Sequence, residues 1–197
     1  MRSTTDEELM RGVRAGDAEA LERLVRRHGP PLLSFITRMV RDSTEAEDLF
    51  QEVWVAVWAK RRSFDVSRRF TPWMYRIAAN RCADARRRRM VRVHRTLRLT
   101  QPQPQPLPDG AEQEEALAAA DAAILTLPEA QREVAVLRLF ASLGYAEIAR
   151  VLGVSESTAR SHMSLALRTL RRDLASWVED GLPAGPKEMT DDRAQAR

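Results

Sequence analysis

The sequence predicts an all-α protein of two small helical domains joined by a proline-rich linker. Alanine, leucine, arginine and glutamate are abundant and glycine is scarce, with 8 residues in a chain of 197, and such a composition favours helix. Apolar residues recur at three- and four-residue spacing in both halves of the chain. Between the halves, residues 100–115 hold four prolines and no aromatic residue, so this stretch cannot form a core.

These observations place a first domain at residues 1–95, a linker at 96–116, a helix-turn-helix domain at 117–178 and a flexible tail at 179–197. The tail is assigned because the end of the chain lacks apolar periodicity. The linker composition fits either a semi-rigid spacer or a segment that binds a partner.

In the first domain, the first helical signal begins at Asp17, a suitable N-cap, and is expected to stop at Gly29-Pro30-Pro31. A second apolar stretch follows at 32–40. A third helix is predicted from Ser43 to about Arg61, with acidic residues in its first turn and on one side. Its core-facing residues are Ala46, Leu49, Phe50, Val53 and Val57.

After a loop at 63–70, Thr71-Pro72 predicts the start of another helix, because proline suits the first helical position. This helix should carry Trp73 and Ile77 as core residues and continue into four consecutive arginines at 86–89. Cys82, the only cysteine, lies in its middle. A buried packing role for this thiol is favoured over a redox-sensing one.

The basic charge of the chain is concentrated in this region. Residues 60–98 carry 14 arginines or lysines against Asp65 and Asp84, which gives +12, whereas the whole chain carries +4. Such a block can be a solvated face or a disordered arm. Four aromatic residues lie within it, however, and this mixture favours a surface for nucleic-acid phosphates and bases.

The second domain is predicted from near Leu117 to about Trp177, with a helix boundary at Leu127-Pro128 and an amphipathic helix at 129–139. Residues 145–170 carry the most specific local pattern. A short helix ends at Gly153, which tolerates positive φ, and Ser155 can cap the helix that follows. This order predicts a helix-turn-helix.

In the second of these helices, one stripe of residues recurs at three- and four-residue spacing and should face the core: Ala159, Met163, Ala166, Leu170 and Leu174. The opposite face carries serines and arginines. Arginine reads guanine edges and serine adapts to base or phosphate when such a helix enters the major groove. An ordinary helical hairpin with a polar exterior fits the periodicity equally well.

Three strings in this order resemble the extracytoplasmic-function (ECF) sigma factors over nearly the whole chain. Residues 45–58 (EAEDLFQEVWVAVW) are similar to the region 2 helix, residues 70–89 to the promoter-melting segment, and residues 145–172 to region 4. The resemblance implies a region 2 helical bundle and a region 4 helix-turn-helix. It also implies a factor that binds core RNA polymerase and directs promoter-specific initiation through −10 and −35 recognition and strand capture.

The resemblance further assigns roles to residues. It implies that the clamp helices of the polymerase β′ subunit are bound by Asp48, Leu49, Gln51 and Glu52. The residues themselves show only an acidic face, which suits a basic partner or solvent equally. The unpaired −10 strand would be held by Phe64, Arg68, Arg69, Phe70, Tyr75, Arg76, Asn80 and Arg81. Arginines there neutralise phosphates while aromatic rings stack on bases.

The −35 element would be read by Ser157, Arg160, Ser161, Ser164 and Arg168. Family members commonly carry basic residues where this chain has His162 and Leu165, and Leu165 on an exposed face suggests a protein contact. The implied partners are core RNA polymerase, through its β′ and β subunits, promoter DNA and an anti-sigma factor.

Other function classes fit the sequence less well. No phosphate-binding glycine loop, metal-ligand cluster or nucleophile motif is present, so no enzyme, cofactor or metal is expected. No stretch approaches the roughly 20 apolar residues of a membrane span, and a cytoplasmic location without membrane insertion is expected. A stand-alone helix-turn-helix regulator is the main alternative, but it leaves the basic aromatic region unexplained. An RNA-binding adaptor would have no need of the second domain.

Overall fold

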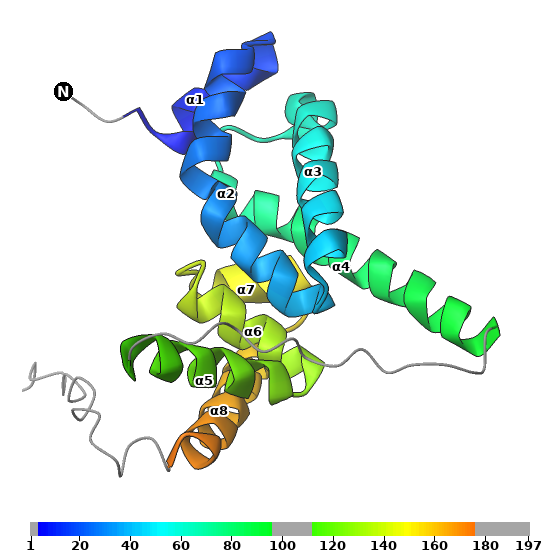
Figure 1. The fold of residues 1–197 in the computed structure, drawn as a ribbon. Coiled ribbons are helices and arrows are strands. Elements are labelled where there is room, and N and C mark those ends of the chain that lie inside the picture. The colour runs from blue at the N-terminus through cyan, green and yellow to red at the C-terminus, as the bar shows by residue number, and fades with distance from the viewer. Residues whose placement is uncertain (1–3, 96–111, 176–197) are drawn as a thin grey trace, which may run out of the picture.

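The computed structural model describes residues 4–95 and 112–175, and every regular element in these two ranges is helical (Figure 1). The predicted tail and most of the predicted linker lie outside the described residues, whereas residues 112–116 belong to a helix. In chain order the elements are α1 (Asp6–Ala15), α2 (Ala18–Val40), α3 (Ser43–Ala59), a 3-10 turn η1 (Arg61–Ser63), α4 (Phe70–Arg95), α5 (Glu112–Thr126), α6 (Glu129–Leu139), α7 (Tyr145–Leu152) and α8 (Glu156–Asp173).

The first helix, α1, has no counterpart in the sequence prediction, although the chain carries its signals. The Thr5 side chain accepts from the backbone N–H of Glu8, and the Glu8 side chain accepts from that of Thr5, which together form a capping box. Gly16 ends the helix at φ 98°. The apolar side of α1 is buried against α2 and α4.

The predicted stop at Gly29-Pro30-Pro31 is wrong, because α2 runs through both prolines as one helix of 23 residues. A proline inside a helix costs about 3 kcal/mol or more. Fully buried side chains lie on both sides of the interruption, including Leu24 and Ile36. Burying such a side chain contributes about 1.5–3 kcal/mol, so packing across the break offsets the cost.

The next two helices follow the prediction closely. Helix α3 starts at Ser43 after an Asp42 cap, and it buries Ala46, Leu49, Val53 and Val57 as expected, with Phe50 half-buried. Helix α4 starts at Phe70, one residue before the predicted cap.

The single thiol is a core group. Cys82 is buried in α4, and burial raises the pKa of its thiol to about 12, with a smaller contribution from Glu133. At neutral pH almost no thiolate exists to react. The packing role predicted for Cys82 is therefore confirmed.

Helices α6 to α8 confirm the helix-turn-helix prediction. Gly153 adopts φ 71° between α7 and α8, and Ser155 caps α8 by accepting from the backbone N–H of Thr158. The predicted inward stripe of α8 is buried, apart from half-buried Leu174. Local capping and periodicity were sufficient to predict α7 and α8, because residues at the ends of these two helices satisfy their terminal backbone hydrogen bonds.

The two halves of the chain pack against each other. Helix α7 lies against α4, and α6 lies against α2 (Figure 1). Arg38 of α2 pairs with Asp121 of α5 at 2.6 Å, and its guanidinium lies 4.2 Å from the centre of the Phe140 ring. Arg86 of α4 pairs with Glu129 of α6. The interface therefore joins arginines of the first half to acidic and aromatic groups of the second.

Within the described ranges, no helix combines the length and the apolar character that a membrane span requires.

Candidate nucleic-acid interface

The residues predicted to hold an unpaired strand fall into two groups. Arg68, Arg69, Arg76 and Asn80 are exposed, and Arg81 is half-exposed. They project from the loop between η1 and α4 and from the first three turns of α4. Arg76 and Asn80 are four residues apart, so they lie on the same side of the helix. This part of the prediction describes a basic, accessible surface.

The aromatic members of the same prediction are core residues. Phe64, Phe70 and Tyr75 are between 0% and 2% exposed, so their rings cannot stack on a base in this arrangement. Tyr75 packs edge-on against Phe35 at 5.3 Å, and burial raises the pKa of its phenol to about 12. In this arrangement the three rings are core residues, packed against one another, Trp73, His28 or Phe35. Their contact with a strand stays a prediction.

Trp73 joins this cluster from the edge. Its ring lies 5.0 Å from Phe64 and 6.1 Å from Phe70, between centroids, yet the residue is only half-buried. The core role expected for Trp73 is therefore only partly met. Ile77, one turn later, is buried as expected.

A cavity of about 550 Å³ lies beside the loop. This volume is in the range of small-ligand sites, about 300–1,000 Å³. First-half lining residues are Ser63, Phe64, Asp65, Ser67, Arg68, Arg69, Pro72, Trp73 and Arg76. Helix α7 supplies Glu147, Arg150 and Val151. The second half of the chain thus forms one wall of the space that the predicted strand residues surround.

Glu147 ties α7 to the loop. Its Oε1 accepts from Arg69 Nη1 at 2.6 Å, while its Oε2 accepts from the backbone N–H of Gly144 at 3.0 Å and caps α7. The Glu147 side chain is 12% exposed and that of Arg69 is 64% exposed. A carboxylate and a DNA phosphate both bind arginine through anionic oxygens. Glu147 therefore occupies a position on Arg69 where a phosphate could bind.

The predicted polymerase-binding residues lie on α3. Asp48 and Gln51 are exposed and Glu52 is half-buried, but Leu49 is 2% exposed and belongs to the core. The Leu49 side chain packs inward in this arrangement, and its direct contact with polymerase stays a prediction. Glu52 pairs with Arg81 of α4 at 3.6 Å, so the acidic face of α3 borders the basic face of α4.

The five residues predicted to read the −35 element are all exposed on α8. Arg160 pairs with Glu156 and lies 4.6 Å from the centre of the Tyr145 ring, so its guanidinium is oriented by two neighbours. Leu165, on the same helix, is 37% exposed. Helix α8 packs on α5, α6 and α7, which leaves its polar face open.

Sequence reasoning missed the residues that hold the loop. Glu147 contacts a residue 78 positions away, and Glu7 of α1 contacts one 63 positions away. Neither contact could be predicted from a local sequence pattern. The capping box at Thr5 and Glu8 could have identified α1 itself.

Comparisons with known proteins agree with this layout. The Sigma-70 region 2 family matches residues 24–92, and the Sigma-70 region 4 family matches residues 117–170. An RNA polymerase sigma factor of Myxococcus xanthus, CarQ, is 32% identical over 82% of this chain and 93% of its own length. The ECF sigma factor SigM of Mycobacterium tuberculosis is 32% identical over 90% of this chain and 88% of its own.

Solved structures share the fold. CnrH, in complex with the cytosolic domain of CnrY, matches 87% of this chain and 97% of its own at 25% identity, with a TM-score of 0.66. The sigma factor RpoE of Bartonella quintana matches 78% of this chain and 96% of its own at 24% identity, with a TM-score of 0.68. The chain belongs to the ECF group of RNA polymerase sigma factors, within the sigma-70 family.

Proposed function

We propose that this sigma factor docks on core RNA polymerase through α3, reads duplex DNA with α8 and captures an unpaired strand with the 64–69 loop and the start of α4. The observation that carries the proposal is the exposed basic and polar surface around the loop, on the same chain as an open helix-turn-helix face. A stand-alone regulator would need only the second of these surfaces.

Strand capture is assigned to the exposed members of the predicted set. Arg68, Arg69 and Arg76 would neutralise backbone phosphates, and Asn80 can donate and accept hydrogen bonds at a base edge. Trp73, half-exposed at the cavity, offers a ring edge to an extruded base. The buried rings behind it support the loop.

Duplex reading is assigned to the N-terminal part of α8. Arg160 is oriented by Glu156 and Tyr145, and a pre-oriented arginine loses less conformational entropy when it binds a guanine edge. Two weak DNA contacts on one chain reinforce each other through effective concentration. The proposed role is non-catalytic, and it places the protein in the cytoplasm with its polymerase.

Capture requires a change in the arrangement described above. Glu147 holds Arg69, and α7 walls the cavity. A phosphate that takes the place of Glu147 on Arg69 would displace this carboxylate, and a strand that fills the cavity would require α7 to move. An anti-sigma partner is also proposed, because the structure of the similar RpoE contains the anti-sigma factor NepR.

Permanganate footprinting of promoter complexes tests the capture assignment. Holoenzyme carrying Trp73→Ala or Arg81→Ala should bind promoter DNA but leave the −10 thymines less reactive than with the unchanged chain. Arg160→Ala should instead weaken promoter binding before melting. Unchanged melting in both first-half variants would contradict the assignment.

A further inference from the structure

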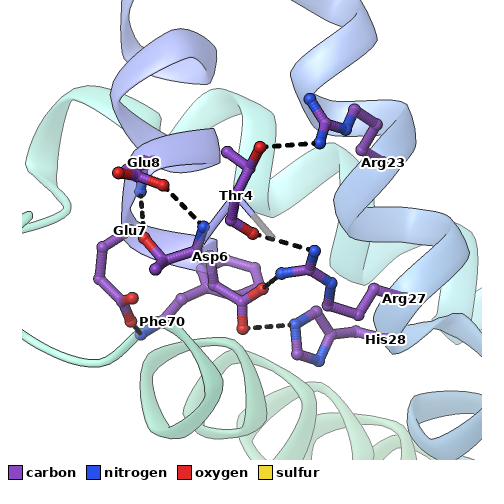
Figure 2. Close-up of polar contacts among 9 residues, drawn as sticks. Thr4, Asp6, Glu7, Glu8, Arg23, Arg27, His28 and Phe70 are labelled. Carbon is purple, nitrogen blue, oxygen red and sulfur yellow. Dashed lines mark hydrogen bonds and ion pairs between the residues drawn. The ribbon is translucent and has the colours of Figure 1, made fainter. Parts of the chain in front are cut away.

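Helix α1 contacts both ends of the strand-capture loop. Arg14 Nη1 donates to the backbone carbonyl of Phe64 at 3.2 Å, where the loop begins. Glu7 Oε1 accepts from the backbone N–H of Phe70 at 3.1 Å, where the loop ends and α4 starts (Figure 2). Two side chains of one short helix therefore span the segment that carries Arg68 and Arg69.

A second set of contacts fixes α1 at the same place. The Asp6 carboxylate binds Arg27 and, at 2.8 Å, His28 Nε2, both on α2 (Figure 2). The His28 ring in turn packs against the Phe70 ring, with centroids 5.4 Å apart. The end of the loop is thus held through its backbone by Glu7 and through its side chain by His28.

Helix α1 is itself rigid enough to act as a support. Leu9, Met10 and Val13 are at most 3% exposed, and the capping box at Thr5 closes the first turn. The helix precedes residues 24–92, the part that matches the region 2 family. Its contacts with the loop therefore join a helix outside the matched segment to residues inside it.

We propose that Glu7 and Arg14 are positioning residues that hold the loop in its strand-binding conformation. The proposal rests on the proposed function of the loop. Polar anchors at both ends reduce the freedom of the five residues between them, so less ordering entropy is lost when a strand binds. Without the anchors, the loop would have to become ordered when the strand binds, and this ordering would lower the affinity for the strand.

The charge of Glu7 makes the test decisive. Removing an acidic residue beside a DNA site favours DNA binding by simple electrostatics, whereas loss of an anchor weakens it. Holoenzyme with Glu7→Ala should bind a fluorescent single-stranded oligonucleotide, selected from a random pool by the unchanged holoenzyme, roughly fivefold to tenfold more weakly. Glu7→Gln keeps an oxygen acceptor and should restore binding.

Matched variants separate positioning from charge and from helix stability. Glu8→Ala removes the same charge and the cap of α1, and it should leave strand affinity unchanged or higher. Arg14→Ala should weaken strand binding by more than Arg11→Ala, which removes the same charge from an exposed position on α1. Affinity for −35 duplex and for core polymerase should not change in any of these variants.

The outcomes distinguish the two proposals. If the unchanged holoenzyme binds the strand and Arg68→Ala/Arg69→Ala loses it, while Glu7→Ala and Arg14→Ala match their controls, the positioning role is overturned and the capture site stands. If Arg68→Ala/Arg69→Ala also binds normally, the capture assignment itself fails. If Glu8→Ala weakens strand binding as much as Glu7→Ala does, the loss comes from a less stable α1, and the positioning role of Glu7 is overturned.

Discussion

The two regions of this sigma factor that we propose to face DNA differ in what surrounds them. The polar face of α8 is open, and its key arginine is oriented by neighbours on α7 and α8 alone. The 64–69 loop is instead contacted by α1 on one side and by α7 on the other. On the proposed function, duplex reading would therefore need only a local helix pair, whereas strand capture would depend on α1 and α7, which are far away in sequence.

The largest effect is expected from removing two loop arginines. Arg68→Ala/Arg69→Ala should weaken single-strand binding by the holoenzyme by roughly a hundredfold at low salt and lower the slope of log affinity against log salt by about 1.4, since each single-strand phosphate contact contributes about 0.7. Fluorescence anisotropy across a salt series measures both quantities. Arg11→Ala/Arg26→Ala, at exposed sites outside residues 60–98, is the charge-matched control, and an equal loss there would contradict strand binding by the loop.

Arg160→Ala should act on the other region alone. A good arginine contact to a base edge contributes about 1–3 kcal/mol, so −35 duplex affinity should fall by about fivefold or more, with single-strand affinity unchanged. Electrophoretic mobility shifts on both probes check this separation. Arg171→Ala, later on α8, provides the comparison, and parallel losses on both probes would contradict a division of labour.

Glu147→Gln tests the obstruction and should have a smaller effect of opposite sign. The amide oxygen can still cap α7 through Gly144, but the ion pair with Arg69 is lost. Because Arg69 is largely exposed, the pair contributes at most about 1 kcal/mol. Single-strand affinity of the free protein should rise at most about fivefold. A fall in affinity would mean that Glu147 supports the loop rather than competing for it.

The smallest signal is expected from Cys82, which reports on the core around the middle of α4. Burial raises the pKa of its thiol to about 12, so the thiolate, the reactive form, is scarce below that pH and rises only as pH approaches it. A thiol reagent at pH 8 should label the folded protein far more slowly than the urea-unfolded chain. Rapid labelling of folded protein would show that the α4 core opens in solution.

Much of the fold could be predicted because its signals are local. The helix-turn-helix follows from a glycine with positive φ, a serine cap and one apolar stripe, all within 26 residues at 145–170. The continuity of α2 could not be predicted, since the cost of Pro30 and Pro31 is local and the packing that offsets it is not. Tertiary packing decides such cases.

The candidate site shows the same limit. The arginines and serines predicted to contact DNA are exposed, apart from half-exposed Arg81, because charged guanidinium and polar hydroxyl groups favour contact with water. Whether Phe64 and Phe70 face a base or the core depends on Trp73, His28 and the contacts of α1. The pairing of Glu147 with Arg69 joins two separate domains of the sequence prediction, and no spacing rule predicts it.

Initiation by core RNA polymerase tests the central claim most directly. Purified core enzyme, with and without this chain, is incubated with pooled genomic fragments, and transcript 5′ ends are sequenced. We expect new start sites that share −10 and −35 elements, that require the chain, and that are lost with Arg68→Ala/Arg69→Ala. A chain that neither binds core enzyme nor creates start sites would contradict it.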